Sequence, residues 1–267
     1  KEPDVHIVFK NKEKLNKFEE DIVRTSSTSG FLINKKEIES KKSFLKGDWW
    51  VQDFSSFFPI NNIIFKNQNL KLLDACAAPG GKSFQLLSKK LDVTLNDKSK
   101  RKIQTLKSNL NRLKFNPKVL NKDFIKFDKN EKFDFIIIDA PCSSTGTIRK
   151  NPDILIRNNI IDLTKLQRIQ KELLKNAASN IKVGGYLMYI VCSLEEEEGE
   201  DIVNKFLETN TNFQILNLNQ YIQDLKTTLK LNTMGYLKFL PIDFKVHQND
   251  HLNGNNGFFS AIIERKF

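Results

Sequence analysis

The stretch that decides the fold is Leu72-Leu73-Asp74-Ala75-Cys76-Ala77-Ala78-Pro79-Gly80-Gly81-Lys82-Ser83. An apolar run ends in an aspartate, passes through a turn of small residues, and opens a helical pattern. This order predicts a β-strand, a nucleotide-binding turn and a helix N-terminus, where free backbone N–H groups and the helix dipole favour an anionic group. Gly80 and Gly81 allow positive φ and close backbone approach, and Pro79 stiffens the turn.

The spacing of small residues in this turn fits neither the dinucleotide pattern G-x-G-x-x-G nor the P-loop pattern G-x-x-x-x-G-K-[ST]. It is nearer to the Asp-x-Gly-x-Gly-x-Gly turn of methyltransferases that use S-adenosylmethionine, with Cys76 and Ala78 in place of the first two glycines. The turn therefore predicts a cofactor site, and an incidental strand-to-helix loop is the alternative.

Length and composition limit the class of protein. A chain of 267 residues with 39% hydrophobic content can form one large domain with a small appendage. No apolar run is long enough to span a bilayer and no signal-peptide pattern opens the chain, so we expect a soluble, cytoplasmic protein. We also expect it to be a monomer. Three widely spaced cysteines form neither a disulfide framework nor a metal-binding pair, so no metal is expected. The chain begins with Lys1, which indicates a fragment or a processed product.

The charge of the chain bears on its partner. A formal charge of +11 and a pI near 9.4 indicate a polyanionic partner such as nucleic acid. The abundance of Lys, Asn, Ile and Phe is also typical of the coding bias of an AT-rich genome, so charge alone leaves this open.

The chain divides into three segments. Residues 1–46 have apolar residues at alternating spacing and then at helical spacing over 15–22, which predicts a small α/β subdomain whose lysines contact RNA or form a solvated surface. Residues 47–69 are an aromatic-rich connector, in which a cluster this dense favours packing between domains over stacking on bases. Residues 70–267 form the domain that contains the turn.

From residue 70 the pattern alternates between strand and helix. We expect strands at 70–75, 93–97, 119–120, 133–139 and 186–191, with a turn at Gly184-Gly185 before the last one. The continuous apolar run at 133–139 indicates a central strand that is buried on both faces. The alternation predicts an α/β fold with a doubly wound parallel sheet.

Acidic residues lie at or just beyond the carboxyl ends of four of these strands: Asp74, Asp97, Asp123 and Asp139. In doubly wound sheets the ligand lies beyond the carboxyl ends of the strands, and we expect the acid after the second strand to accept hydrogen bonds from a ribose. Any one of these aspartates is alternatively a turn or capping residue.

Two cysteines are expected at the same edge of the sheet. Cys142 follows the fourth strand and Cys192 the fifth, although a buried, inert thiol is the alternative for each. Ser193 and Glu196 fit a capping box, which predicts a helix N-terminus directly after Cys192 and a lowered pKa for its thiol. The acidic residues that follow Ser193 would stabilise the helix dipole and oppose this lowering, whereas a cation such as Lys82 would favour it.

Three segments of the chain resemble the signature segments of one family. Asp-Ala-Cys-Ala-Ala-Pro-Gly-Gly-Lys-Ser (74–83), Asp-Ala-Pro-Cys-Ser-Ser-Thr-Gly (139–146) and Val-Cys-Ser-Leu-Glu-Glu-Glu-Glu (191–198) are similar to motifs of the Sun/Nop family of RNA 5-methylcytosine methyltransferases. Within that family they are most similar to the bacterial RsmB-like enzymes, which act on small-subunit ribosomal RNA. The resemblance runs from about residue 47 to Phe259 and implies a Rossmann-like class I methyltransferase domain over 70–267.

The resemblance also implies a reaction and a set of roles. Such enzymes transfer a methyl group from S-adenosylmethionine to carbon 5 of a cytosine through a covalent cysteine adduct. It implies Cys192 as the nucleophile and Cys142 in product release, with Asp139 on the cytosine edge and Lys82 as an organising residue. The implied cofactor-binding residues are Cys76, Ala77, Ala78, Pro79, Gly80, Gly81, Lys82, Asp97, Asp123 and Asp139.

Some positions depart from the family pattern, and some alternatives stay open. Val191, Glu196 and Asn256 stand where threonine, proline and aspartate are frequent, which questions loop geometry more than catalysis. We expect the Asn-rich stretch 247–256 to be a surface loop, and a mobile loop that contacts RNA is the alternative. Many RsmB-like proteins carry an additional N-terminal helical RNA-binding domain, and this chain starts where such a domain would end. The alternatives are Cys142 as the nucleophile, tRNA as the substrate, and a catalytically silent RNA-binding ribosome-assembly factor.

Overall fold

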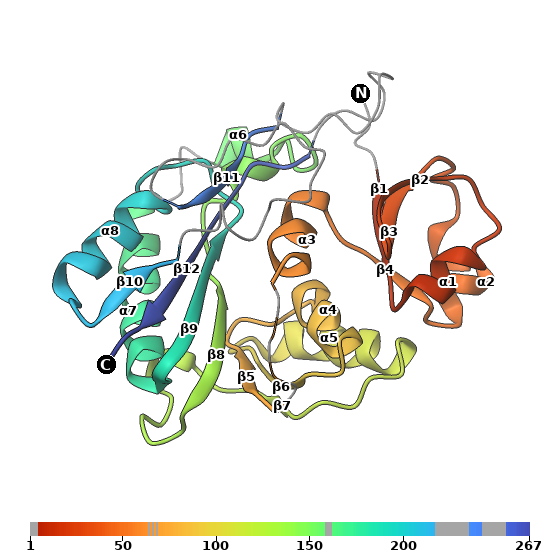
Figure 1. The fold of residues 1–267 in the computed structure, drawn as a ribbon. Coiled ribbons are helices and arrows are strands. Elements are labelled where there is room, and N and C mark those ends of the chain that lie inside the picture. The colour runs from red at the N-terminus through yellow and green to blue at the C-terminus, as the bar shows by residue number, and fades with distance from the viewer. Residues whose placement is uncertain are drawn as a thin grey trace.

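The structure is a computed structural model that describes residues 5–63, 65, 67, 69–157, 162–216, 235–241 and 255–267. Figure 1 shows a small N-terminal sheet beside a larger α/β unit. Of the stretch 247–256, for which a surface loop is expected, all but Asn255 and Asn256 lies outside the described residues. Among the helices of the described part, none has the length and apolarity needed to cross a membrane.

The N-terminal sheet is antiparallel and has the strand order β2-β3-β1-β4. Its elements are β1 (Val5–Phe9), α1 (Lys12–Asn16), β2 (Ile22–Ser26), β3 (Ser29–Leu32), the 3₁₀ helix η1 (Ile38–Ser40), α2 (Lys42–Leu45) and β4 (Trp49–Val51). The helix expected over 15–22 is too long, because α1 ends at Asn16 and Ile22 begins β2. Strand β4 pairs with β1, although its sequence lies in the stretch assigned to the connector.

Two adjacent tryptophans join this sheet to the larger unit. Because side chains alternate along a strand, Trp49 and Trp50 point to opposite sides of β4. Trp49 packs in the N-terminal core with Phe9, and Trp50 packs edge-on against Phe84 of helix α4 (Gly81–Ser88), with ring centroids 5.7 Å apart. Both indoles are buried, which confirms that this aromatic cluster packs one part of the chain against the next.

The larger unit contains a sheet in the order β10-β12-β9-β8-β5-β6-β7, with β11 paired to β12. Its strands are β5 (Lys71–Asp74), β6 (Asp92–Asn96), β7 (Val119–Leu120), β8 (Phe133–Asp139), β9 (Ile181–Val191), β10 (Phe213–Ile215), β11 (Leu237–Phe239) and β12 (Phe258–Arg265). Strands β5 to β9 pair in parallel, whereas β10, β11 and β12 add antiparallel pairs at one side. The predicted Rossmann-like α/β fold is confirmed.

Helices cover both faces of this sheet (Figure 1). Helices α3 (Phe54–Asn61), α4 and α5 (Lys100–Arg112) pack on one face, and α7 (Leu163–Asn180) and α8 (Glu200–Thr209) on the other. The shorter helices are η2 (Phe124–Lys126), η3 (Thr145–Thr147) and α6 (Ile154–Arg157). In β8, Phe135 and Ile137 join the first layer while Ile136 and Ile138 join the second, so this strand is buried on both faces as its apolar run predicts.

Strand β9 is longer than the sequence predicts. It starts at Ile181 and passes through Gly184-Gly185, where a turn was expected. The register against β8 shifts there, with Phe133 opposite Ile181 but Phe135 opposite Tyr186, so the glycines form a bulge. The bulge leaves the carboxyl end of β9 beside the end of β8, where the cysteines follow.

Arg112, the last residue of α5, fastens the two units together. Its guanidinium lies 3.7 Å from the centroid of the Phe44 ring, and its Nη1 donates to the carbonyl oxygens of Phe44 at 2.8 Å and Trp49 at 3.0 Å.

We expect Arg112→Met to lower the free energy of unfolding by about 1–3 kcal/mol, because hydrogen bonds from a charged group contribute about 1.5–3 kcal/mol each and less when partly exposed. Urea unfolding measures the change. Arg101→Met, at an exposed position of α5, is the control, and equal stabilities of the two variants would contradict the role of Arg112.

Candidate active site

The turn between β5 and α4 is held at both ends. Asp74, the last residue of β5, is fully buried, and its Oδ2 accepts a hydrogen bond of 2.6 Å from Ser83 Oγ in the first turn of α4. Between them Gly80 adopts a φ of +119°, and a Cβ at this position would lie 2.1 Å from the Phe84 ring. Both the backbone conformation and the nearby ring therefore require glycine at position 80.

Asp97 ties this turn to the next strand. It follows β6 and is buried, and its two carboxylate oxygens accept from the backbone N–H groups of Ala78 at 3.3 Å and Ser99 at 2.8 Å. Its neighbour Asn96 donates to the carbonyl oxygen of Ala75 at 3.0 Å. Asp97 thus has the turn-capping role that the sequence left open, while its remaining lone pairs are available to a ligand.

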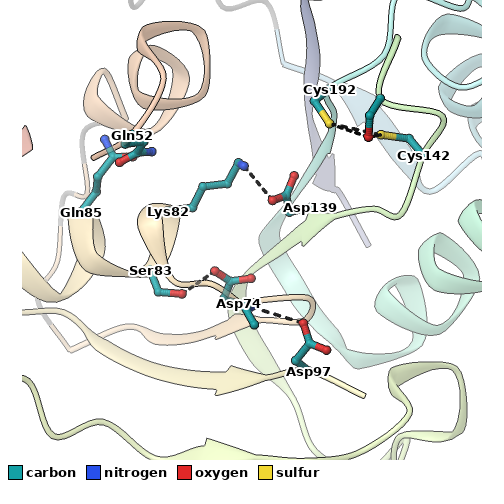
Figure 2. Close-up of polar contacts among 11 residues, drawn as sticks. Gln52, Asp74, Lys82, Ser83, Gln85, Asp97, Asp139, Cys142 and Cys192 are labelled. Atoms are coloured by element: carbon teal, nitrogen blue, oxygen red, sulfur yellow. Dashed lines mark hydrogen bonds and ion pairs between the residues drawn. The ribbon is translucent and has the colours of Figure 1, made fainter. Parts of the chain in front are cut away.

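Lys82 and Asp139 form an ion pair between α4 and the end of β8. Figure 2 shows the Lys82 side chain pointing at the carboxylate, with Nζ 2.7 Å from Oδ2. Burial disfavours the ammonium ion, but the Asp139 carboxylate outweighs this effect and raises the pKa of Lys82 overall. Lys82 is therefore a charged group at neutral pH, and its charge acts on Cys192.

The two cysteines lie in contact. The Sγ atom of Cys142, in the loop after β8, is 3.5 Å from the Sγ atom of Cys192, directly after β9. The hydroxyl of Ser144 lies 3.4 Å from the Cys192 sulfur and 3.9 Å from the Cys142 sulfur. Figure 2 shows the two thiols pointing toward one another. The two strand-end thiols therefore share one edge of the sheet.

The surroundings give the two thiols unequal acidity. A hydrogen bond from Cys142 lowers the pKa of Cys192 to about 7, with help from Ser144 and from the charge of Lys82, while burial and Asp139 oppose the shift. The same hydrogen bond, together with burial, raises the pKa of Cys142 well above its usual value. Cys192 is thus partly ionised at neutral pH, whereas Cys142 keeps its proton.

The helix that the sequence placed directly after Cys192 is not there. Helix α8 begins only after its N-cap Gly199, and Ser193 Oγ accepts a hydrogen bond of 3.1 Å from the backbone of Glu195. The predicted capping box is wrong because two hydroxyls of the Cys142 loop also bind Ser193 Oγ, each at 3.1 Å, and hold it in a loop. The lowered pKa of Cys192 therefore comes from its neighbours and not from a helix dipole.

One member of the acidic run 195–198 has a role that sequence reasoning missed. Glu198 is 0% exposed, and its carboxylate accepts from the backbone N–H of Ser143 at 2.9 Å and from Gln170 Nε2 at 3.0 Å. The sequence assigned the whole run to the dipole of a helix. Periodicity cannot find a buried acid in a loop, and the available signal is its place in the signature segment that contains Cys192.

The two cysteines, Asp97 and Asp139 line one cavity of about 320 Å³. The predicted site residues that line it are Cys76, Ala78, Asp97, Asp123, Asp139, Cys142 and Cys192. The other predicted site residues, Ala77, Pro79, Gly80, Gly81 and Lys82, are not among its described lining residues. Further lining residues, which the sequence did not single out, are Lys98, Lys102, Phe124, Ile125, Pro141, Ser144, Ile169 and Leu173.

The cavity has the features that a nucleoside cofactor such as S-adenosylmethionine needs. Two residues of the turn before α4, Cys76 and Ala78, line it. The Asp97 carboxylate lines the cavity, and Phe124 and Ile125 supply an apolar wall. Burial raises the pKa of Cys76 above its usual range, so its thiol is a neutral part of the lining. Within the described ranges, no group of three or more His, Cys, Asp or Glu residues could hold a metal ion.

A comparison with protein families matches residues 63–264 to the family described as 16S rRNA methyltransferase RsmB/F. The chain belongs to the RsmB/F family. This match covers all three signature segments, and it confirms the relationship that they predict.

Individual relatives of this RsmB/F chain agree with the family match. Ribosomal RNA small subunit methyltransferase B of Shewanella oneidensis is 34% identical over 199 residues, which cover 72% of this chain and 46% of the relative. Human 28S rRNA (cytosine(4447)-C(5))-methyltransferase is 32% identical over 243 residues, which cover 85% of this chain and 29% of the relative. The crystal structure of NSun6 from Pyrococcus horikoshii with SFG has a TM-score of 0.67 and 25% identity, over 86% of this chain and 56% of that chain. This chain therefore spans 46% and 29% of the length of the two curated relatives and 56% of the solved structure.

Asp74 makes the stability of this RsmB/F chain depend on pH. Burial raises the pKa of Asp74 from 3.8 to about 7, although Ser83 and Lys82 oppose the shift. Because the folded-state pKa lies above that of the unfolded chain, the contribution of Asp74 is favourable at acidic pH and is lost as the pH rises from 3.8 to about 7. We expect Asp74→Asn to remove this loss, so that its unfolding free energy relative to wild type is higher at about pH 8 than at about pH 5.

Denaturant unfolding at a series of pH values measures this effect. Asp92→Asn, at an exposed position that begins β6, is the matched control. Parallel pH profiles for wild type and Asp74→Asn would show that Asp74 does not contribute in this way.

Proposed function

We propose that this chain carries the catalytic domain of an enzyme that transfers a methyl group from S-adenosylmethionine to carbon 5 of a cytosine in RNA. One observation carries the proposal: two cysteine sulfurs 3.5 Å apart line the same cavity as the turn that opens α4. A fold that only binds RNA has no need of two thiols of unequal acidity beside a cofactor turn.

Cys192 is the nucleophile in this proposal. Carbon 5 of cytosine is a weak nucleophile, and addition of a thiolate to carbon 6 makes carbon 5 part of an electron-rich enamine. A thiol with a pKa of about 7 supplies thiolate at neutral pH and later leaves readily. Asp139 is proposed to bind the cytosine edge, with its carboxylate oriented by the ion pair with Lys82.

The cofactor is proposed to bind at the turn. S-adenosylmethionine, when bound, supplies an electrophilic methyl group for carbon 5. The residues proposed to hold it are the turn from Cys76 to Lys82 together with Asp97, Asp123 and Asp139. Of these, Asp97 is best placed to accept from ribose hydroxyls, because backbone N–H groups already fix the orientation of its carboxylate.

The second half of the reaction frees Cys192. A base removes the proton from carbon 5, the electrons of that C–H bond form the double bond between carbons 5 and 6, and the bond from carbon 6 to sulfur breaks with its electron pair on sulfur. The Cys142 thiol, 3.5 Å away, donates a hydrogen bond to the leaving sulfur and so stabilises it as a thiolate. This is the proposed contribution of Cys142 to product release.

The proposed substrate is small-subunit ribosomal RNA, because the family description and the Shewanella relative name that RNA. The net charge of +11 supports a polyanionic partner, and the small N-terminal sheet is proposed to contact RNA. The proposal includes action as a monomer in the cytoplasm. Bisulfite mapping of RNA from cells with and without the protein tests the substrate, and a cytosine that changes only in tRNA would replace ribosomal RNA in the proposal.

The two cysteines are expected to respond differently to substitution. Cys192→Ala abolishes both the covalent RNA adduct and methyl transfer, because no thiolate adds to carbon 6. Cys142→Ala retains the adduct and slows turnover about tenfold to a hundredfold, since a hydrogen bond to a charged group is worth about 1.5–3 kcal/mol. Denaturing gels of enzyme with labelled RNA detect the adduct, and labelled methyl transfer gives the turnover. Loss of the adduct in Cys142→Ala with retention in Cys192→Ala would assign the nucleophile to Cys142.

Removal of the Asp97 carboxylate is expected to weaken cofactor binding. Asp97→Ala should raise the dissociation constant for S-adenosylmethionine about tenfold to a hundredfold, because it loses charge-assisted hydrogen bonds worth about 1.5–3 kcal/mol. Calorimetric titration measures this, and Asp92→Ala, on the exposed start of β6, is the control. An unchanged titration of folded Asp97→Ala would remove Asp97 from the cofactor site.

A further inference from the structure

Glu198 is a buried carboxylate beside the thiol pair. It lies in the loop between β9 and α8 and is 0% exposed. Its Oε1 accepts from the backbone N–H of Ser143 at 2.9 Å and from Gln170 Nε2 at 3.0 Å, and its Oε2 accepts from the Ser143 hydroxyl. Among the interactions of the described residues, no ion pair neutralises it. A buried charge of this kind is costly unless hydrogen bonds satisfy it, so its position is strongly fixed.

These hydrogen bonds hold the backbone on both sides of Cys142. Gln170 Nε2 also donates to the carbonyl oxygen of Pro141 at 2.9 Å, while Glu198 holds the N–H of Ser143. Helix α7 and the loop before α8 therefore fix the peptide groups immediately before and after Cys142. The thiol is directed toward Cys192 by this support, although neither Glu198 nor Gln170 is bonded to a sulfur atom.

The same network reaches the loop of Cys192. The hydroxyl of Ser143 lies 3.1 Å from that of Ser193, the residue after Cys192, and Tyr189 donates its hydroxyl to the carbonyl oxygen of Glu198 at 2.7 Å. The loops of the two cysteines are therefore joined by one polar network.

Charge is distributed unequally around the pair. The charged or titratable groups that face the two thiols are Lys82 from α4, Asp139 from the end of β8, Tyr189 from β9 and Glu198 from the loop before α8. The negative charge of Asp139 acts on Cys192, where Lys82 offsets part of its effect, and the negative charge of Glu198 acts on Cys142. The charge of Glu198 therefore disfavours ionisation of Cys142, whereas ionisation of Cys192 is favoured chiefly by the hydrogen bond from Cys142.

We propose that Glu198 is a positioning residue: its carboxylate fixes the Cys142 loop so that the Cys142 thiol donates to the Cys192 sulfur, and its negative charge keeps the shared proton on Cys142. The role of Cys192 as nucleophile rests on the proposed function. The distribution of the proton between the two sulfurs does not, because it is a property of the free protein.

Alkylation of the full chain with iodoacetamide tests the proposal without RNA or cofactor. The rate at each cysteine is followed by peptide mass mapping over a range of pH. In wild type, Cys192 is expected to react faster than Cys142, with a midpoint near 7. In Glu198→Gln the ratio of the Cys192 rate to the Cys142 rate is expected to fall about tenfold, which is the effect of one unit in relative pKa, and the midpoint of Cys192 is expected to rise.

The control variant is Glu197→Gln, which removes an exposed carboxylate from the same acidic run and should leave both rates unchanged. A second variant, Gln170→Leu, removes the amide that supports Pro141 and Glu198 but keeps the charge of Glu198. It should lower the ratio of the Cys192 rate to the Cys142 rate by a smaller amount. If Glu198→Gln does not fold, this variant serves as the test of the positioning role. Wild-type rates and midpoints in every folded variant would overturn the proposal.

Methyl transfer provides a separate readout. With the function as proposed, Glu198→Gln should lower kcat and shift its pH profile to higher pH, while the dissociation constant for S-adenosylmethionine stays as in wild type. Changed alkylation rates in a protein without methyl transfer activity would leave the positioning role of Glu198 standing and reject the proposed function. Normal alkylation with normal methyl transfer in Glu198→Gln would reject the positioning role alone.

Discussion

The site depends on the hydrogen bond between Cys142 and Cys192. Burial alone would keep both thiols neutral, but when one of the two is ionised this bond holds the remaining proton on Cys142 and the negative charge on Cys192. Burial opposes ionisation of both groups, so any difference between them must come from directed neighbours. The Cys192 sulfur accepts the hydrogen bond, and Lys82 offsets part of the effect of the nearby Asp139 carboxylate. The Cys142 thiol donates the bond, and the negative charge of Glu198 further disfavours its ionisation. This asymmetry makes Cys192 the more acidic thiol of the pair, while Cys142 keeps its proton.

The sheet brings these loops together because of its topology. Strands β8 and β9 are parallel neighbours, so the loops that leave them start at the same edge. Strand β12 is antiparallel to β9 and therefore begins at that edge, which brings Gly257 against Gly146 in the Cys142 segment, with the N–H of Gly257 donating to the Gly146 carbonyl at 2.7 Å. A Cβ at position 146 would lie 2.2 Å from the Gly257 oxygen, so this contact also depends on glycine.

The sequence predicts which residues lie at this edge of the sheet, but it does not predict the hydrogen bonds that hold their loops in place. The succession of strands β5 to β9 along the chain, the turn that contains Gly80 and the placement of Cys142 and Cys192 at one edge follow from apolar runs and from the rule that parallel strands end together. The capping box at Ser193 fails because a local motif was outweighed by hydroxyls from a loop distant in sequence. Glu198 was missed for the same reason, since its burial depends on contacts with Ser143 and Gln170 that no local pattern encodes.

The small N-terminal sheet helps to hold the site in place. The two residues that follow β4, Gln52 and Asp53, contact several elements that surround the site. Gln52 accepts from Trp50 Nε1 at 2.9 Å and donates to Gln85 of α4 at 2.8 Å, so it joins the sheet to the helix that presents Lys82. Asp53 caps α3, pairs with Lys150 downstream of the Cys142 loop, and accepts from the N–H of Asn256 at 3.3 Å. Burial opposes ionisation of Asp53, yet Lys150 lowers its pKa overall, so this contact is a charged one. Two consecutive polar residues, Gln52 and Asp53, therefore connect the small sheet to helix α4 and to the segments that contain Lys150 and Asn256.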